Sequence, residues 1–354
     1  MRRWRSSRLF PIGVGLVLAV AAALACGPPE RAPAAPSGAA AQAPAAPAPV
    51  KITVGYPVVS ATYIQLFAGG EKGFWQAEGL ELEPALTNGV PAIVQAILGG
   101  SYQLGSVSAD VGILAVEQGA DLVYVAGELR QAVFSVIAQP EIRSFADVRG
   151  GKVIGAASVR GGTSTLLRAL FTQHGLKEGE DYVMVAAGST TERVTALRSR
   201  AIDAGLFAQP HDLQMRDEGF SLLGMTNEAI PDYAMSALAA KREWARANED
   251  TLVRALRAHI RTLRWIYDPA SKPELIEMIA RHTRIDERYA ARTYELLVEQ
   301  LQTFVRDGAL IPTPFEGALK VLIDSGELRP PAPPVSKYFD TRYWEQAIAS
   351  LPPS

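Results

Sequence analysis

The chain has 354 residues, 48% of them hydrophobic and 20% charged, with a formal net charge of −2. Such a composition indicates a globular protein with room for one large or two medium domains. A weakly acidic chain without a long basic run argues against nucleic acid as a partner. The one cysteine, Cys26, excludes internal disulfides and CxxC motifs, and the scattered histidines lack metal-ligand spacing, so we expect no metal site.

Residues 1–25 have the pattern of a secretory signal peptide. Four arginines precede an apolar stretch, residues 12–25, that is short for a bilayer span of about 20 residues. The sequence Ala23-Leu24-Ala25-Cys26 resembles a bacterial lipobox, although Ala23 stands where Leu is usual. We expect Cys26 to be lipidated. The alternative is cleavage by the ordinary signal peptidase after Ala23 or Ala25, which would leave a free thiol.

Residues 26–50 follow as a linker. Positions 28–49 contain seven prolines and ten alanines, a composition that buries no core and stays extended. We therefore expect a spacer between a membrane surface and a folded body that begins near Lys51.

Strand and helix patterns alternate in the first part of that body. Short β-rich runs and apolar periodicity mark each element, and this alternation indicates βαβ units with a mostly parallel sheet. In chain order we predict strands at 51–56, 80–85, 103–106 and 122–126, and helices at 61–77, 88–98 and 109–118.

The same order then recurs about 100 residues later. We predict strands at 152–155, 182–186 and 203–207, a helix at 163–174, and another that starts at the capping box Ser189-Thr-Thr-Glu192. Val94, Ala96 and Gly105 match Val194, Ala196 and Gly205, and Gly55 matches Gly155, each at an offset of 100 residues. This repetition favours two lobes of similar topology.

Two apolar runs, 133–138 and 233–238, fall where the chain would cross between the lobes. Helices are predicted beyond them at 248–267, 273–281 and 286–305, returning to the first lobe, with a possible last helix at 338–351. The predicted organisation is 51–135 and 236–354 for lobe I and 136–235 for lobe II. Trp75 and the other tryptophans are interpreted as packing residues.

Several short motifs in this order resemble a known family. They are Gly55-Tyr-Pro57, Glu71-Lys-Gly-Phe-Trp75 with Gly79-Leu80-Glu81, Asp147-Val-Arg-Gly-Gly-Lys-Val-Ile-Gly155, and Gly161-Gly-Thr-Ser-Thr165. Together, over about residues 51–310, they resemble the periplasmic substrate-binding proteins of ABC transporters, in the sulfonate, nitrate and thiamine-precursor class (SsuA/THI5-like, NMT1-like).

The resemblance implies an α/β, two-lobed periplasmic-binding-protein fold of type II. Each lobe would be a mostly parallel sheet flanked by helices, and two crossing strands would join them. It implies an extracytoplasmic binding component, without catalysis or cofactor, that passes a small organic anion or a related molecule to a permease and its ATPase subunits. We expect a lipid-anchored monomer on the periplasmic or extracytoplasmic face of a bacterial membrane.

Ligands in open parallel sheets bind beyond the carboxyl ends of the strands, where helix N-termini favour anions. The loop 158–165 is the best candidate, because its glycines permit close approach of the backbone and its hydroxyls add donors. It contributes Arg160, Gly162, Thr163 and Ser164 as candidates, with a solvated surface position as the alternative for Arg160.

Other candidates lie in the equivalent loops. Tyr56, Thr62 and Tyr63 follow the first strand, and the alternative for both tyrosines is packing within the lobe. Ser108 fits an N-cap that also reaches the cleft, and Gln209 is its counterpart in lobe II. Glu128 and Arg130 at the first crossing are expected to pair with each other, or Glu128 could meet an amine on the ligand.

An enzyme on the same fold, of the thiamine-pyrimidine synthase type, is the alternative function. That enzyme needs a cysteine-rich iron motif, and this chain has only Cys26. No GxSxG elbow or Cys/His arrangement is present, so we expect a binding protein.

Overall fold

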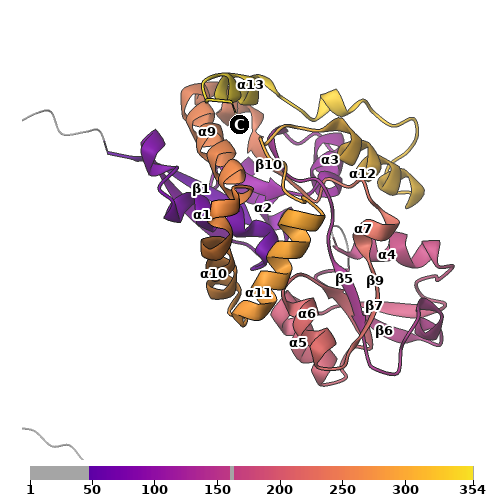
Figure 1. Cartoon of the computed structure of the whole chain (residues 1–354). Coiled ribbons are helices and arrows are strands. Elements are labelled where there is room, and N and C mark those ends of the chain that lie inside the picture. The colour runs from indigo at the N-terminus through magenta and orange to yellow at the C-terminus, as the bar shows by residue number, and fades with distance from the viewer. Residues whose placement is uncertain (1–47, 160–162, 354) are drawn as a thin grey trace, which may run out of the picture. The chain divides into compact units, whose positions relative to one another are not determined.

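Two five-stranded sheets organise the part of the chain that the computed structural model describes, residues 48–159 and 163–353 (Figure 1). The first sheet has the order β2 (Leu80–Leu86), β1 (Val50–Tyr56), β3 (Leu104–Val107), β10 (Ser236–Lys241) and β4 (Leu122–Leu129). The second has the order β7 (Tyr182–Ala186), β6 (Lys152–Ala156), β8 (Ala204–Phe207), β5 (Ser135–Ala138) and β9 (Ser221–Met225).

Each sheet contains one reversed strand. β10 pairs antiparallel with β3 and β4, and β5 pairs antiparallel with β8 and β9, while the remaining pairs are parallel. The reversed strand is in both cases the one by which the chain enters a sheet from the other. The predicted α/β fold with two similar, mostly parallel sheets is confirmed, and each sheet is mixed because of this entering strand.

The 100-residue repeat corresponds to equivalent elements. β1, β2, α2 (Val90–Leu98) and β3 of the first sheet match β6, β7, α5 (Thr190–Arg198) and β8 of the second. A Cβ atom on Gly55 would lie 2.7 Å from the Tyr102 ring, and one on Gly155 would lie 2.7 Å from Ile202. The two glycines therefore match because each strand passes close to a bulky side chain.

The crossing segments lie between β4 and β5 and between β9 and β10. They are hydrogen bonded to each other, since the Phe134 amide donates to Thr226 Oγ1 (3.0 Å) and the Thr226 amide donates to the Phe134 carbonyl (2.9 Å). The predicted run 133–138 therefore includes the end of the first crossing and all of β5, and the run 233–238 includes the end of the second crossing and the start of β10.

Helices flank both sheets. The remaining α-helices are α1 (Ile64–Glu71), α3 (Ala109–Glu117), α4 (Thr163–Gln173), α6 (His211–Asp217), α7 (Thr226–Ala229), α8 (Arg242–Ala247), α9 (Glu249–Ile266), α10 (Lys272–Thr283), α11 (Glu287–Tyr294), α12 (Pro312–Asp324) and α13 (Arg342–Ala349). Short 3-10 turns occupy Ala61–Tyr63, Gln76–Glu78, Phe145–Val148, Pro269–Ser271 and Val335–Lys337, and a π-helical turn occupies Glu295–Gln300. Within the described residues, none of these helices combines the length and apolar character needed to cross a membrane.

Three predicted helices are shorter than expected. The predicted helix 61–77 is interrupted after Glu71, because the chain turns at Gly73, whose φ is +71°. The helix predicted at 286–305 ends at Gln300, and Phe304 instead forms an antiparallel bridge with Leu129. The last helix starts at Arg342, since the backbone of residues 338–340 bonds to Tyr124 of β4. The sequence patterns did not predict α6, β9, α7, α8 or α12.

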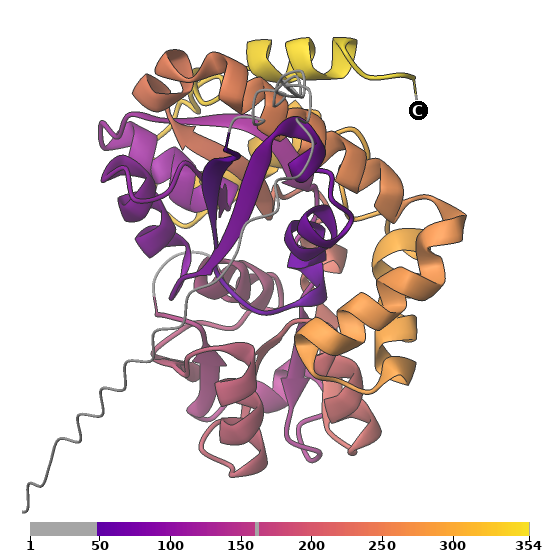
Figure 2. The same cartoon turned by 90° about the vertical axis from the view of Figure 1, so that its left-hand side faces the viewer.

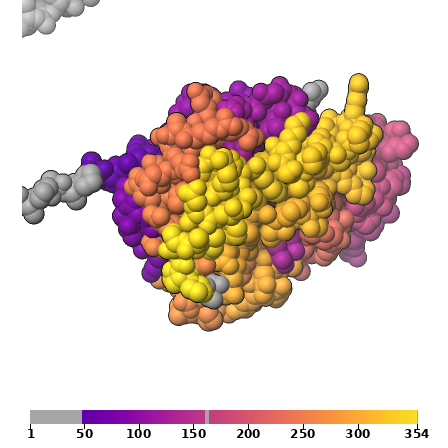
Figure 3. All heavy atoms as spheres, turned by 90° about the horizontal axis from the view of Figure 1, so that it is seen from above, coloured from indigo at the N-terminus to yellow at the C-terminus, as the bar shows by residue number. Residues whose placement is uncertain are grey.

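The C-terminal segment covers the outer edge of the first sheet. The Tyr124 amide donates to the Tyr338 carbonyl (2.9 Å), and the Asp340 amide donates to the Tyr124 carbonyl (3.0 Å). Figure 3 shows this segment, in yellow, lying across one face of the molecule. These two bonds satisfy the backbone groups of Tyr124 at this edge, and the covering segment hinders pairing of the edge strand with other chains.

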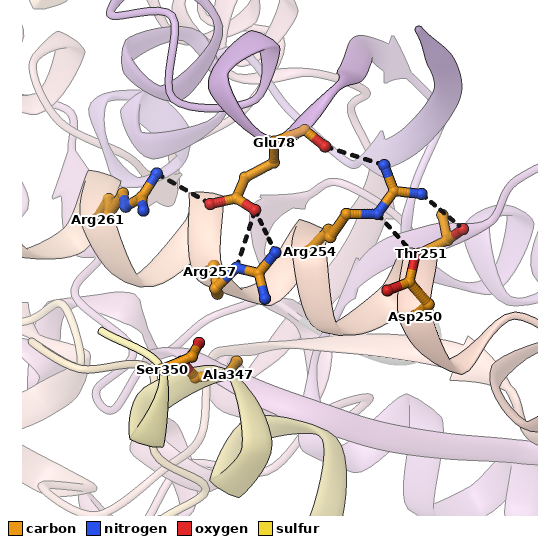
Figure 4. A network of polar contacts seen from close by, with 8 residues as sticks. All are labelled: Glu78, Asp250, Thr251, Arg254, Arg257, Arg261, Ala347 and Ser350. Carbon is orange, nitrogen blue, oxygen red and sulfur yellow. Dashed lines mark hydrogen bonds and ion pairs between the residues drawn. The ribbon is translucent and has the colours of Figure 1, made fainter. Parts of the chain in front are cut away.

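A buried ion-pair network attaches α9 to the turn before β2 (Figure 4). The Glu78 side chain is only 6% exposed; it accepts a hydrogen bond from Arg257 (2.5 Å) and forms an ion pair with Arg261 (2.9 Å). Trp75 in the same turn is 2% exposed, so its predicted packing role is confirmed.

Helices α10 and α11 lie beside both sheets (Figure 2). Arg281 and His282 of α10 pair with Glu71 of α1, beside the first sheet. Arg292 of α11 pairs with Asp217 of α6, beside the second sheet, at 3.1 Å. This helical pair therefore connects the two halves at a third place besides the crossings.

Candidate ligand-binding site

A cavity of about 380 Å³ lies between the two sheets, where the crossings pass. Its walls come from the loop after β1, the start of α2 and the residue before α3 on one side, and from the loop after β6 and the start of α5 on the other. The lining residues are Pro57, Val58, Tyr63, Asn88, Gly89, Val90, Pro91, Ala92, Ser108, Phe134, Ala157, Ser158, Gly188, Ser189, Thr190, Arg193 and Met235. Both sheets therefore direct the carboxyl ends of their parallel strands at one cavity.

Among the described residues of this lining, Arg193 is the one with a charged side chain, and it is only 2% exposed. Its Nε donates to the Leu206 carbonyl (2.8 Å), Nη1 donates to the Gly188 carbonyl, and Nη2 donates to Thr190 Oγ1 (3.3 Å). These bonds use three of the five guanidinium N–H groups. No carboxylate of the described residues forms an ion pair with Arg193.

The capping box of α5 explains this arrangement. Glu192 precedes Arg193, but its carboxylate accepts from the Ser189 amide (2.6 Å), and the Ser189 hydroxyl accepts from the Glu192 amide (3.3 Å). Burial lowers the pKa of Arg193 to about 10, and the charge of Glu192 only partly opposes this shift. The guanidinium is therefore a buried cation whose charge only an incoming anion would pair directly.

Three helix N-termini also meet the cavity, those of α2, α3 and α5. Their first amides carry partial positive charge and lack intrahelical acceptors. Ser108 caps α3 without a side-chain cap bond, and its buried Oγ has no hydrogen-bond partner in the part of the chain that the structure describes. The Ser108 hydroxyl and the amides at these helix ends therefore supply hydrogen-bond donors in addition to the guanidinium of Arg193.

Tyr63 connects the cavity to a buried polar cluster. It is 1% exposed and lies close to Ser236, whose hydroxyl donates to Glu128. Burial, followed by the charge of Glu128, raises the pKa of Tyr63 well above its usual range. Tyr63 is therefore a neutral phenol at any physiological pH.

Glu128 lies in this cluster and outside the cavity lining. Its carboxylate accepts from Gln65 (3.2 Å) and Ser106 (3.0 Å) as well as Ser236. The predicted pairing of Glu128 with Arg130 is wrong, because Arg130 donates instead to the Leu301 carbonyl (3.3 Å). Glu128 joins β4 to β3, β10 and α1.

Of the other predicted residues, Ser108 and Tyr63 line the cavity, whereas Tyr56 and Thr62 lie outside its lining. Tyr56 packs edge-on against Phe67, with ring centroids 5.6 Å apart, and burial raises its pKa. The Thr62 hydroxyl bonds to Ser60 Oγ (3.0 Å). The 3-10 turn at 61–63 directs only Tyr63 to the cavity.

Gln209 connects the two halves without lining the cavity. Its carbonyl accepts from Ser60 Oγ (3.2 Å), and its Nε2 contacts Asp212 at 3.4 Å. Ser164 in the first turn of α4 is fully buried. Arg160, Gly162 and Cys26 lie outside the described residues, and so does the side chain of Thr163.

Sequence reasoning missed Arg193, Asn88, Phe134 and Met235. The 100-residue offset contained a usable signal for part of this set, because Asn88–Val90 and Gly188–Thr190 line opposite walls at equivalent positions. Phe134 and Met235 come from the crossings, where no local pattern indicates which side chain faces inward. The described residues contain no group of three or more His, Cys, Asp or Glu side chains placed to hold a metal ion.

Two sheets of matching strand order, joined by two crossings around one cavity, define the periplasmic-binding-protein class of fold. A family model described as NMT1/THI5 like matches residues 60–272, so the chain belongs to the NMT1/THI5-like family. A Brucella abortus (strain 2308) protein named as a candidate binding protein is 27% identical over 279 residues, which are 76% of this chain and 83% of that protein.

Solved structures agree on the fold. The periplasmic nitrate-binding protein NrtA from Synechocystis PCC 6803 superposes with a TM-score of 0.73 at 15% identity, covering 86% of this chain and 89% of its own. The alkanesulfonate-binding protein SsuA from Xanthomonas axonopodis pv. citri, bound to MOPS, superposes with a TM-score of 0.67 at 16% identity, covering 84% and 100%.

Proposed function

We propose that this chain is the extracytoplasmic solute-binding component of an ABC importer and that it binds a small organic anion in the cavity between the sheets. The observation that carries this proposal is the buried guanidinium of Arg193, which lies on the cavity wall without a carboxylate partner among residues 48–159 and 163–353. A buried charge of this kind is costly unless it is paired. An anionic ligand would supply the missing partner.

The remaining lining supports an organic rather than an inorganic anion. Val58, Pro91, Phe134 and Met235 contribute apolar surface to a cavity of about 380 Å³. That volume lies within the usual range for small organic ligands, whereas nitrate or bicarbonate would leave most of it unfilled. A sulfonate or carboxylate with an organic body fits best, and a thiamine-pyrimidine type ligand is the neutral alternative.

Binding without catalysis fits the chemistry of the walls. Among the described lining residues there is no carboxylate, imidazole or thiol, and the pKa of Tyr63 is raised well above its usual range. These walls therefore offer few groups that could act as a general acid, a general base or a nucleophile. The relatives support the same role, since the Brucella protein is named for binding, and NrtA and SsuA for binding nitrate and alkanesulfonates.

Transport would follow from closure of two lobes, 51–135 with 236–354 and 136–235, around the ligand. Contacts such as Ser60 to Gln209 would stabilise the closed form. The signal peptide and the linker 26–50 support an extracytoplasmic location with a lipid anchor on Cys26. The partners would be a permease and its ATPase subunits. A Cys26→Ser protein that still partitions with membranes would contradict the anchor.

A thermal-shift panel tests the binding role directly. The protein is unfolded and refolded to remove carried-over ligand, then screened with taurine, short alkanesulfonates, aromatic carboxylates, thiamine pyrimidines, nitrate and bicarbonate. A ligand at 100 times its Kd stabilises the fold by about 2.7 kcal/mol. We expect organic anions to raise the Tm and the two inorganic ions to have little effect. A folded protein that responds to no organic anion would contradict the proposal.

A further inference from the structure

A second cavity, of about 390 Å³, lies away from the first and shares no lining residue with it. It is formed by the start of the first crossing, the end of α9, the start of α10, the end of α11 and the chain that follows to α12. Its lining residues are Arg130, Tyr267, Pro269, Lys272, Tyr294, Val298, Glu299, Gln302, Phe304, Val305, Arg306 and Ile311.

Three cations face this cavity with one acid. Lys272 pairs with Glu299 at 2.7 Å, so these two charges compensate each other. Arg130 and Arg306 form no ion pair with any carboxylate of the described residues. The Nε atom of Arg130 is buried and has no hydrogen-bond partner within the described ranges, and the guanidinium of Arg306 lies over the Tyr267 ring, 5.4 Å from its centroid. The cavity is therefore net positive.

Aromatic and aliphatic surface completes the walls. Phe304, Val298 and Val305 are buried core residues whose side chains border the cavity. Tyr267 donates its hydroxyl to the Phe304 carbonyl (2.7 Å), and its ring is part of the cavity wall. Apolar walls with a few convergent cations are the usual composition of a site for an organic anion.

The backbone at this cavity departs from regular structure in two places. The π-helical turn Glu295–Gln300 forms one side, and Gln302 has φ +47°, a left-handed value that is uncommon for a residue other than glycine. π-helical turns and residues with such φ values are found disproportionately at functional sites. Here they bring the Leu301 carbonyl to Arg130 and direct the following strand-like segment to β4.

We propose that this second cavity is a separate binding site for a small carboxylate or similar monoanion with a compact aromatic or apolar body. Arg130 and Arg306 contact the anionic group, and Tyr267 and Phe304 contact the body. Because Arg130 directly follows β4 at the start of the first crossing, the bound anion touches the segment that joins the two sheets. The site is independent of the function proposed for the first cavity.

Calorimetric titration with benzoate tests the proposal, with benzamide as a neutral probe of the same shape. The titration is made in the Arg193→Gln background, so that binding in the first cavity is suppressed. We expect benzoate to bind this variant and benzamide not to bind it. Adding Arg130→Gln should weaken binding about 10-fold or more. Adding Arg306→Gln, at an exposed position that is safe for folding, should weaken it about 3- to 5-fold.

Arg246→Gln is the matched control, because Arg246 is an exposed arginine of α8 outside this cavity. The protein that carries both Arg193→Gln and Arg246→Gln should bind benzoate with the same Kd as the Arg193→Gln protein. Absence of benzoate binding, equal binding of benzamide, or equal weakening by Arg246→Gln and Arg306→Gln would each overturn the proposal. If Arg130→Gln fails to fold, the comparison of Arg306→Gln with Arg246→Gln still decides the outcome.

Discussion

Replacing Arg193 with glutamine should weaken ligand binding strongly and change the free energy of unfolding little. The lowering of the pKa of Arg193 to about 10 corresponds to about 3 kcal/mol of unfavourable free energy for the buried charge. The three hydrogen bonds of the guanidinium, at roughly 1–1.5 kcal/mol each, offset a similar amount. Removing both contributions should leave the free energy of unfolding within about 1 kcal/mol of the parent.

The free energy of ligand binding has no such offsetting contribution. Truncating one member of a buried charge pair costs about 2–5 kcal/mol, which is a rise in Kd of roughly 30- to 4,000-fold. Calorimetric titration with the strongest organic anion of the panel gives the Kd, and urea unfolding gives the free energy. Arg198→Gln is the control, because Arg198 is on the same helix but is 45% exposed and paired with Glu218. A folded Arg193→Gln protein with a Kd within about 3-fold of the parent would refute the assignment of Arg193 to the anion.

Three further substitutions test other features. Ser108→Ala should raise the Kd about 2- to 12-fold and leave the free energy of unfolding unchanged or higher by up to about 1 kcal/mol, because the buried Oγ has no partner among the described residues of the free protein. Calorimetric titration measures the Kd, and urea unfolding measures the free energy. His211→Gln should reduce the acid sensitivity of folding. Burial lowers the pKa of His211 to about 4 from about 6.5 in the unfolded chain, so the unfolded state binds more protons between these values and the parent loses up to about 3 kcal/mol as the pH falls through them. Urea unfolding at pH 7, 5.5 and 4.5 should show the parent losing more stability than the variant, and parallel curves would contradict this. Glu78→Gln should cost about 2–3 kcal/mol, since it leaves Arg257 and Arg261 without their shared carboxylate, whereas Asp250→Asn, at a side chain 87% exposed, should cost less than about 0.5 kcal/mol.

Local signals in the sequence were sufficient for most of the architecture. Alternation and apolar runs predicted β1, β2, β6 and β7 within a residue or two, because side chains on strands alternate between faces. The capping box at Ser189 located the start of α5, since both of its hydrogen bonds are formed within four residues. The 100-residue offset indicated two equivalent halves, because β1, β2, α2 and β3 recur in the same order as β6, β7, α5 and β8.

Long-range packing decided the features that local patterns do not encode. The end of the helix before Gln302 depends on Leu129 of a distant strand, and the start of α13 depends on Tyr124. Glu128 was expected to meet Arg130, but residues 22 to 108 positions away in the sequence supply its donors instead.

The candidate site divides in the same way. The sequence alone indicated the loops that follow the strands, and Ser108 and Tyr63 of those loops do reach the cavity, because chain direction determines the edge at which each loop emerges. In the sequence, Arg193 looks like any polar residue one turn into a helix. In the folded chain it donates to the Leu206 carbonyl of β8 and lines the cavity together with residues of the crossings. Burial and the choice of partners are properties of the folded arrangement, so only the tertiary structure could identify the cation on which the proposed anion site depends.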